Sequence, residues 1–479
     1  MTRAPQTSPP RSPTTDWLLF GGLYLFELLA LLALLALYRT GPHATHLAFL
    51  QSLSGLLFLG STLSCISLGT MLVMLAVRNS RNGSNRWLFA LVTNLVVVGS
   101  VIVITEVVLR LAVTQRGIGK ELNGRLLYPR QWEQVAARYQ GILEQARMQP
   151  PYDVAHPLLG WTIAPSRTSA NGLYKSSVEG LRSPEAGVAL RSIETDCRVA
   201  LLGDSFTFGE HVPYEQTWAH FLDSALGPAC QVLNFGVGGY GIDQMYLRYT
   251  EEARGWSPNV VVFAFIDHDV FRALGIYSFL MFPGGAMPFT KPRFVLDNDD
   301  LRLLNLPLIS SDEIFRMPSI RDLPFIEYDW EYRATEWDRP GWEWSTRLYG
   351  FRLLTSLYPL YEPARSEIAS EQLFGIGRQI FRRFWGEALA DGTVPLMIYL
   401  PSERDFEQAP TWDPVGVRLL RELNIPHVDL RPCMRQVGVE DMFRPPQLGG
   451  HYSEAGNRRV STCLLDTVRA MVSTSTAAS

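Results

Sequence analysis

The sequence lacks the features that mark nucleic-acid-binding and repetitive proteins. Its 43 Lys and Arg residues are slightly outnumbered by 47 Asp and Glu residues, which gives a net charge of -4. No block of basic residues is interleaved with aromatic residues, so the electrostatic footprint of a DNA or RNA partner is missing. No internal repeat is visible. At 479 residues the chain is nevertheless too long for one ordinary domain, and we expect two or three units.

Cysteine is scarce, with five residues in the whole chain. Cys65 lies in an apolar run, whereas the remainder of the chain holds Cys197, Cys230, Cys433 and Cys463. Cys197 and Cys230 each stand near the start of an expected strand, so a disulfide between them is geometrically possible if the two strands are neighbours. The even count of these four cysteines fits an oxidising compartment, and free buried thiols are the alternative.

Long apolar runs are confined to the first quarter of the chain. Trp17–Tyr38, Leu53–Val77 and Trp87–Val113 are each long enough to span a bilayer. We therefore predict a disordered tail over residues 1–15 and a transmembrane region of three helices over residues 16–115. No small-residue cleavage site follows the first run, which argues against a signal peptide. The runs contain few polar residues and no repeat, which argues against a transporter-like unit.

The basic residues around these runs predict their orientation. Arginines precede the first run and lie between the second and third, which places both segments in the cytoplasm and the rest of the chain outside it. Arg116, Lys120 and Arg125 follow the third run and weaken this bias. Glu106 and Arg110 are four residues apart near its end, so we expect them to pair with each other on one helical face.

The remainder of the chain alternates apolar runs with helical patterns. Strands are predicted at residues 198–202, 231–235, 260–266, 394–400 and 426–430. Their near-continuous apolar character predicts a parallel sheet covered on both faces, in an α/β fold of three layers. Crossover helices are predicted at residues 217–226 and 415–423, and a stalk or docking helix at 130–148. The final helix is predicted to begin after the N-cap Ser453. The domain limits follow as a stalk or docking segment over 116–151, the α/β domain over 152–472, and a disordered tail over 473–479.

A long insertion, residues 274–352, separates the third and fourth strands. Residues 291–304 predict a hairpin with a polar turn. The insertion also holds four tryptophans, which would line a sugar or acyl site or pack a lid: Trp330, Trp337, Trp342 and Trp344. Because long insertions in compact domains are usually functional, we expect a lid or substrate wall.

The most informative segment is 199–209, where an apolar run ends in Gly203-Asp204-Ser205 and Gly209 follows. This pattern predicts a buried strand with Ser205 in the turn at its carboxyl end, which is where open α/β sheets bind ligands. Ser205 is therefore a candidate nucleophile if a histidine lies nearby. The alternative is a serine that merely caps the next helix.

Three glycine-containing blocks follow one another along the chain. They are Gly-Asp-Ser-Phe-Thr-Phe-Gly at 203–209, Asn-x-Gly-x-x-Gly at 234–239, and Gly-Gly-His at 449–451. Together with His156–Trp161 and Gly180–Arg182, this order resembles the SGNH/GDSL family of esterases and acyltransferases over about residues 152–472. The resemblance implies a flavodoxin-like three-layer SGNH hydrolase domain. It also implies Ser205 as the nucleophile and His451 as the base.

The sequence departs from this family at the residue that orients the base. The family commonly carries an Asp three residues before the His, and this position is Leu448. A Ser–His dyad is the simpler assignment, with a backbone carbonyl or a carboxylate such as Asp441 holding the imidazole. Asp204 is expected to support the turn through local hydrogen bonds.

A second departure concerns the oxyanion hole. The resemblance implies the N–H groups of Ser205 and Gly239 as donors, together with an Asn side chain whose position here is His268. An imidazole N–H can take that role, and flanking Asp267 and Asp269 would support its protonated form. The alternative makes His268 the base and His451 auxiliary. Consecutive residues at a strand end cannot all point at one ion, so no metal site and no cofactor are expected.

These inferences together predict a membrane-anchored serine esterase that acts outside the cytoplasm. Because the domain would be tethered to a bilayer, its substrates are expected, by analogy, to be acyl esters of a polysaccharide, cell wall or lipid. An O-acyltransferase would use the same residues. A catalytically silent glycan-binding module in envelope assembly is the remaining alternative, and no nucleic-acid partner is expected.

Overall fold

The computed structural model describes residues 105–478 except 299, 340, 342, 358–366, 410–411, 437 and 446–449, together with residues 99, 102 and 103. The chain divides into two compact units, Met1–Arg130 with Asp338–Tyr361 and Gln131–Trp337 with Glu362–Ser479. In the described part, no helix combines the length and the apolarity needed to cross a bilayer. The first two predicted spans and most of the third lie outside the described residues.

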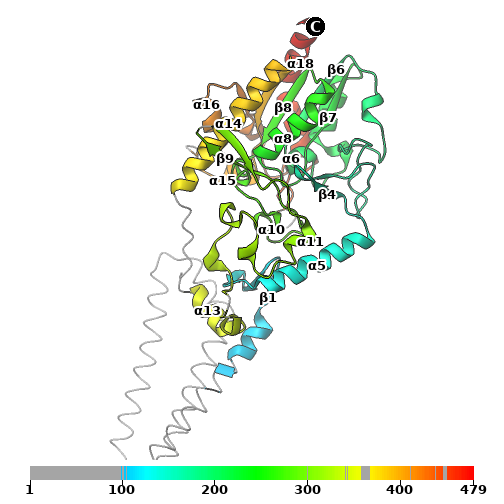
Figure 1. Cartoon of the computed structure of the whole chain (residues 1–479). Coiled ribbons are helices and arrows are strands. Elements are labelled where there is room, and N and C mark those ends of the chain that lie inside the picture. The colour runs from blue at the N-terminus through cyan, green and yellow to red at the C-terminus, as the bar shows by residue number, and fades with distance from the viewer. Residues whose placement is uncertain are drawn as a thin grey trace, which may run out of the picture. The chain divides into compact units, whose positions relative to one another are not determined.

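The larger unit is built on a five-stranded parallel sheet (Figure 1). The strands are β6 (Cys197–Leu202), β7 (Cys230–Asn234), β8 (Val260–Phe265), β11 (Val394–Tyr399) and β12 (His427–Asp429). Every end lies within one residue of its prediction. The spatial order β7-β6-β8-β11-β12 is 2-1-3-4-5 in chain order, which is the order of flavodoxin-like sheets. The predicted α/β class with a parallel sheet is therefore confirmed.

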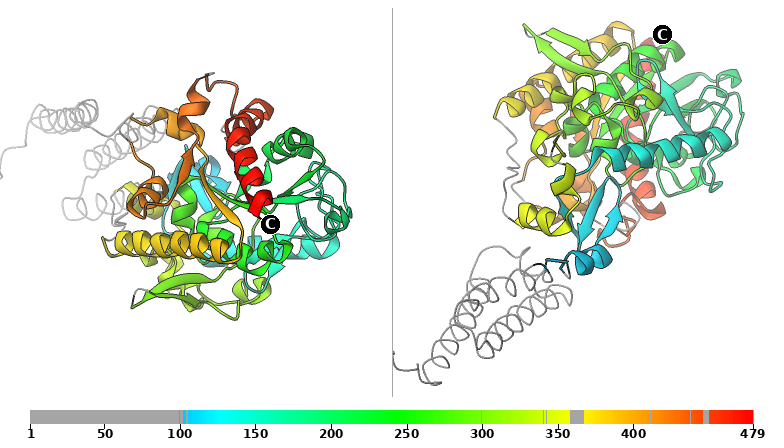
Figure 2. Two further views of the ribbon diagram at one scale, coloured as in Figure 1. Left: turned by 90° about the horizontal axis from the view of Figure 1, so that it is seen from above. Right: turned by 60° about the horizontal axis from the view of Figure 1, so that its bottom comes forward.

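Both faces of the sheet are buried, which explains the near-continuous apolar strands. Along β6, Val199 and Leu201 enter one core while Ala200 and Leu202 enter the other. The first core is closed by α7 (Trp218–Leu226), α17 (Arg431–Arg435) and α18 (Glu454–Ala478). The second is closed by α8 (Ile242–Glu251), α14 (Glu367–Ala390) and α16 (Val415–Glu422). Figure 2 shows α18 in red and α14 in yellow on opposite sides of the strands.

Three short helices begin at the carboxyl edge of this sheet. They are α6 (Ser205–Phe208) after β6, α9 (Asp267–Arg272) after β8 and α15 (Glu403–Glu407) after β11. Because parallel strands end on the same edge, the side chains at these three helix starts converge.

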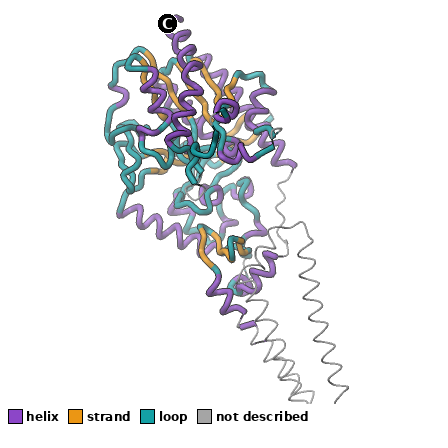
Figure 3. Tube along the Cα trace, turned by 180° about the vertical axis from the view of Figure 1, so that it is seen from behind, coloured by secondary structure: helices purple, strands orange, loops and turns teal. Residues whose placement is uncertain are grey.

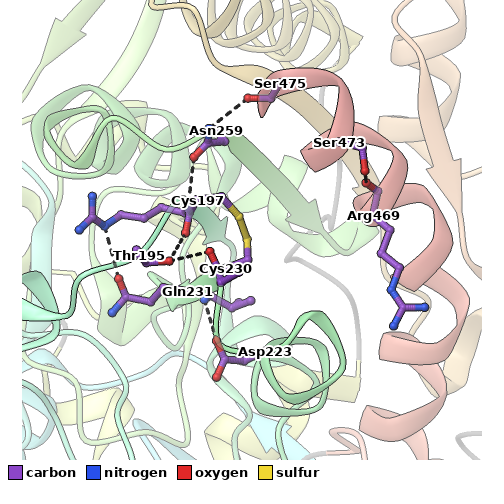
Figure 4. The surroundings of a disulfide bond; sticks show 12 residues. Thr195, Cys197, Asp223, Cys230, Gln231, Asn259, Arg469, Ser473 and Ser475 are labelled. Carbon is purple, nitrogen blue, oxygen red and sulfur yellow. Dashed lines mark hydrogen bonds between the residues drawn. A yellow bond between two sulfur atoms is a disulfide. The ribbon is translucent and has the colours of Figure 1, made fainter. Parts of the chain in front are cut away.

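Two disulfides strengthen the larger unit. Cys197 and Cys230 are direct partners in the β6–β7 register and are bonded to each other, as the sequence allowed (Figure 4). Cys433 of α17 is bonded to Cys463 of α18.

The chain end differs from its prediction. Residues 473–478 were expected to be a disordered tail, but α18 continues to Ala478. Ser475 of this last segment accepts a hydrogen bond from the Asn259 amide at 3.2 Å, which ties the helix end to the chain just before β8 (Figure 4).

Helix α5 (Trp132–Met148) forms as predicted, and of the two roles expected for it, stalk or docking helix, the structure shows a docked helix. Tyr139 stacks on Phe315 of the insertion at 4.6 Å, and Trp132 packs edge-on against Trp337 at 6.1 Å. The apolar face of α5 is therefore buried within the larger unit.

The insertion contains α10 (Ser278–Met281), α11 (Ser311–Ile314) and the predicted hairpin, β9 (Arg293–Asp297) paired with β10 (Asp300–Leu304). Trp337 is 1% exposed and belongs to packing, so it does not line a ligand site as the sequence had suggested. Trp330 packs against the core that contains Ala200 and Leu202, whereas Trp342 and the side chain of Trp344 lie outside the described part. Before the sheet begins, β4 (Asp153–His156) and β5 (Gly160–Ile163) form a hairpin, and a long connection that is mostly loop leads to β6 (Figure 3).

The smaller unit holds a three-stranded antiparallel sheet that the sequence analysis missed within the expected stalk. Its strands are β1 (Thr114–Arg116), β2 (Gly119–Leu122) and β3 (Arg125–Leu127), and its helices include α12 (Glu343–Thr346) and α13 (Tyr349–Leu357). Leu353 of α13 packs with Leu109, Leu122 and Leu127. The end of the insertion thus belongs to this unit. The predicted pair of Glu106 and Arg110 is present at 2.8 Å.

Candidate active site

Ser205 is presented by a tight turn between β6 and α6. Asp204 is the N-cap of α6, and its Oδ1 accepts a hydrogen bond from Phe206 N at 2.9 Å. Gly203 makes the turn possible, because a Cβ at this position would overlap Thr207. Ser205 is consequently the first residue of the helix, where its N–H has no intrahelical acceptor. Asp204 thus makes a local hydrogen bond within the turn, of the kind that the sequence analysis expected.

His451 is in contact with Ser205. Its Nε2 lies 2.8 Å from Ser205 Oγ, although the two residues are 246 positions apart. The competing acceptor for the hydroxyl, Asp204 Oδ2, lies farther away at 3.3 Å, so the hydroxyl donates to the imidazole. The backbone of His451 is held by Arg444 N, which donates to its carbonyl at 2.7 Å, and Phe206 packs on its ring.

The other side of the imidazole faces a second histidine. His451 Nδ1 lies 3.1 Å from His211 Nδ1. Asp441, which the sequence offered as a partner for this nitrogen, lines a different cavity with Met442 and Arg458. Leu448, in the position of the family's Asp, lies outside the described residues.

Two buried carboxyl groups and the mostly buried Arg272 lie close to the nucleophile. The Arg272 guanidinium contacts Asp204 Oδ2 at 3.1 Å and also pairs with Asp269. Burial and the neighbouring Asp204 carboxylate raise the pKa of Asp269 well above its ordinary value, while Arg272 opposes this shift. Asp269 also accepts a hydrogen bond from Ile266 N at 2.9 Å. This side chain therefore fixes the start of α9.

Glu210 adds a carboxyl group beside the imidazole of His451. Its Oε2 lies 3.5 Å from His451 Nε2. Burial raises the pKa of Glu210, and nearby His451 lowers it in part. The pKa of His451 itself is lowered, chiefly by burial and against the opposing effect of Glu210 and Asp204. His451 is thus favoured in the neutral form that accepts a proton.

The three groups expected to donate to the oxyanion are the N–H groups of Ser205 and Gly239 and the His268 side chain. Gly239 has φ of 78°, a conformation that favours glycine, and Asn234 ties its loop to the nucleophile by donating to Thr207 O at 2.8 Å. His268 lies on α9 with an exposed side chain. Its neighbours have other partners, since Asp267 accepts from Val415 N at 2.7 Å and Asp269 pairs with Arg272.

Ser205, His451 and His268 line one cavity of about 640 Å³. Its wall also includes Arg272, Ser402, Glu403, Arg404 and Trp412, which come from α9 and the chain after β11. Such a volume is in the usual range for small-molecule sites. Among the described residues no group of three or more side chains is arranged to hold a metal ion.

Sequence reasoning missed Glu210, His211 and Arg272. Glu210 and His211 directly follow Gly209 of the nucleophile block, so their position in the sequence was a usable signal. The left-handed backbone of His211, with φ of 68°, leaves no trace in the sequence. Arg272 follows His268 by four residues, one helical turn, and the short helix α9 was not predicted.

Comparison with known proteins gives structural similarity only. No family model matches the chain, and no curated protein matches it. Among solved structures, TesA is 13% identical, with a TM-score of 0.32, over 57% of this chain and 99% of that one. A G-D-S-L family protein from Desulfitobacterium hafniense is 13% identical, with a TM-score of 0.27, over 56% and 98%. An acetylxylan esterase from Geobacillus stearothermophilus is 12% identical, with a TM-score of 0.28, over 57% and 94%.

Proposed function

We propose that the chain is a serine esterase that hydrolyses acyl esters through Ser205 and His451. The observation that carries this proposal is the contact of 2.8 Å between Ser205 Oγ and His451 Nε2 at the carboxyl edge of the sheet. Both residues line the cavity of about 640 Å³, so a substrate has access to the nucleophile. A serine that only caps a helix needs neither the imidazole nor the cavity.

The reaction follows from this geometry. His451 Nε2 takes the proton of the Ser205 hydroxyl while Oγ bonds to the acyl carbon. Collapse of the tetrahedral intermediate breaks the ester bond, and the imidazolium gives its proton to the departing alcohol. Water then attacks the acyl-enzyme by the same proton route and restores Ser205. If a sugar hydroxyl replaces water, the same residues perform acyl transfer.

The negative oxygen of the intermediate needs donors that are already in place. We assign this role to the N–H groups of Ser205 and Gly239, with His268 as the third donor. Removal of one such donor typically costs about 3–4 kcal/mol of barrier stabilisation. Arg272 and the carboxyl groups of Asp204, Asp269 and Glu210 lie close to Ser205 and His451 and contribute to the electrostatic field in which the oxyanion forms.

The test is covalent labelling of the purified protein with a fluorophosphonate probe. We expect the wild type to be labelled and to hydrolyse p-nitrophenyl acetate, and Ser205→Ala to do neither. The matched control is Ser453→Ala, a serine near the same edge that caps α18 and does not contact His451. Absence of labelling in folded wild-type protein would refute the esterase and favour the silent glycan-binding module.

We further propose that the chain is anchored in a membrane and that the esterase acts outside the cytoplasm. The three apolar runs of the first 115 residues support the anchor. The helix of residues 105–112, at the end of the third run, keeps Val107 and Leu111 exposed at 50% and 83%, as a lipid-facing surface would. Two disulfides are typical of proteins outside the cytosol. Reporter fusions after Arg125 test this topology, and a cytoplasmic signal would refute it.

A further inference from the structure

We propose that His211 is a positioning residue that orients His451 from Nδ1, so that a neutral imidazole takes the place of the carboxylate in a Ser–His–acid triad. This inference rests on the proposed function and assigns a third member to its catalytic group. The observation that carries it is the contact of 3.1 Å between the Nδ1 atoms of the two rings.

The proton positions follow from the two contacts of His451. Its Nε2 must be unprotonated to accept the Ser205 proton, so the single proton of the neutral ring is on Nδ1. That Nδ1–H points at His211 Nδ1, which must then be unprotonated and carries its own proton on Nε2. The arrangement is self-consistent, because each contact has one donor and one acceptor. When His451 accepts the serine proton, its Nδ1–H remains donated to His211.

No other described side chain is placed for this role. Glu210 is the nearest carboxyl group, but its 3.5 Å contact is with Nε2, the nitrogen that faces the nucleophile. Asp204 and Asp269 are held by Arg272. Residues 446–449, which precede His451 outside the described part, read Pro-Gln-Leu-Gly, and the sequence from Pro445 to Gly450 contains no acidic residue.

His211 is held in place from both sides of its backbone. Its N–H donates to Tyr174 Oη at 3.0 Å, and its carbonyl accepts from Arg444 at 3.0 Å. Its φ of 68° lies in the left-handed region, which costs free energy for a side chain larger than glycine. The surroundings therefore impose a conformation that brings this ring to His451. Burial and Arg444 lower the pKa of His211, which favours the neutral acceptor form.

Because His211 has a left-handed backbone, one substitution can test its role in orienting His451 without disturbing the fold. Glycine adopts a φ of 68° without strain, so His211→Gly removes the ring and leaves the turn intact. We expect its thermal midpoint to stay within about 3 °C of the wild type. The second-order rate of fluorophosphonate labelling is expected to fall on the order of 10- to 100-fold, because the imidazole loses its orientation.

The second variant, His211→Asp, restores an acceptor. Asp Oδ1 stands the same number of bonds from Cα as His Nδ1, and Asp tolerates the left-handed region. A carboxylate stabilises the imidazolium and raises the pKa of His451, so neutral base is available only at higher pH. We expect labelling to recover to within about threefold at high pH, with the acid limb of the pH–rate profile moved up by about 1 unit. Glu210, Asp204, Arg272 and Arg444 also face the ring pair and are unchanged in both variants.

The outcomes are distinct. If wild-type protein is not labelled, the proposed function fails. If the wild type is labelled and His211→Gly reacts as fast, the positioning role of His211 is refuted. The same conclusion follows if His211→Gly is slow and His211→Asp neither restores the rate nor moves the acid limb.

Discussion

Removal of the Arg272 charge is the most informative perturbation of the site. The side chain is 11% exposed, and it contacts two carboxylates, Asp204 and Asp269, that are 0% exposed. Arg272→Met keeps much of the side-chain volume but leaves both carboxylates without their cation. Breaking a buried ion cluster from one side costs roughly 3–5 kcal/mol, because a charge remains buried and uncompensated. We expect a loss of this size at pH 8.

The loss should depend on pH with a definite sign. The pKa of Asp269 is already raised in the folded protein, and removal of Arg272 raises it further. In the pH range between the unfolded and the folded pKa, the folded state binds more protons than the unfolded state, so stability falls as pH rises. Arg272→Met should therefore lose less stability at pH 5, where Asp269 is protonated in a larger share of the folded molecules, than at pH 8.

Urea unfolding of the wild type and the variants at pH 5 and pH 8, followed by tryptophan fluorescence, measures both quantities. Arg272→Lys is the matched control, since it keeps a positive charge and should recover a large part of the loss. An Arg272→Met variant as stable as the wild type at pH 8 would refute the buried ion cluster. Equal losses at the two pH values would refute the raised pKa of Asp269 as the cause of the pH dependence.

Two further predictions concern the base and the second disulfide. His451→Ala should lower turnover of p-nitrophenyl acetate at least about a hundredfold. His268→Ala should remove one oxyanion donor and leave the pH of half-maximal rate unchanged. The reverse pattern would make His268 the base. The double variant Cys433→Ser/Cys463→Ser opens a loop with a sequence separation of 30, so we expect a loss of about 3–4 kcal/mol in urea unfolding. An unchanged denaturation midpoint would contradict that estimate.

The sheet could be predicted because its signal is local. Each strand is a short apolar run that ends in turn residues, and burial on both faces removes the alternation that would otherwise confuse strand with helix. The small sheet β1–β3 was missed because its strands have only three or four residues and its first strand, Thr114–Arg116, is fully exposed. The helical end of α18 was missed because Ser and Thr are weak helix formers, and the hydrogen bond between Ser475 and Asn259 is not visible in the sequence.

The site was predictable only in part, for a physical reason. Ser205 and His451 stand in blocks that combine glycine with a strand end or a helix cap, and such blocks mark an edge of the sheet. Glu210, His211 and Arg272 act through distances across the fold. His211 depends on a backbone conformation that Tyr174 and Arg444 impose from distant segments. The position of Glu210 and His211 directly after the nucleophile block places them near Ser205, but their contacts with His451 depend on segments that are distant in the sequence.

The choice of an imidazole at His211 is consistent with the charges already present. Asp204, Asp269 and Glu210 place three carboxyl groups around the nucleophile, with Arg272 as the buried cation between two of them. A further carboxylate on His451 would oppose the negative oxygen that forms on the substrate, and it would also keep the base protonated up to a higher pH. A neutral acceptor orients the same Nδ1–H without adding charge. The imidazolium form of His451 is stabilised less, because a neutral acceptor binds an ionised donor less strongly than a carboxylate does.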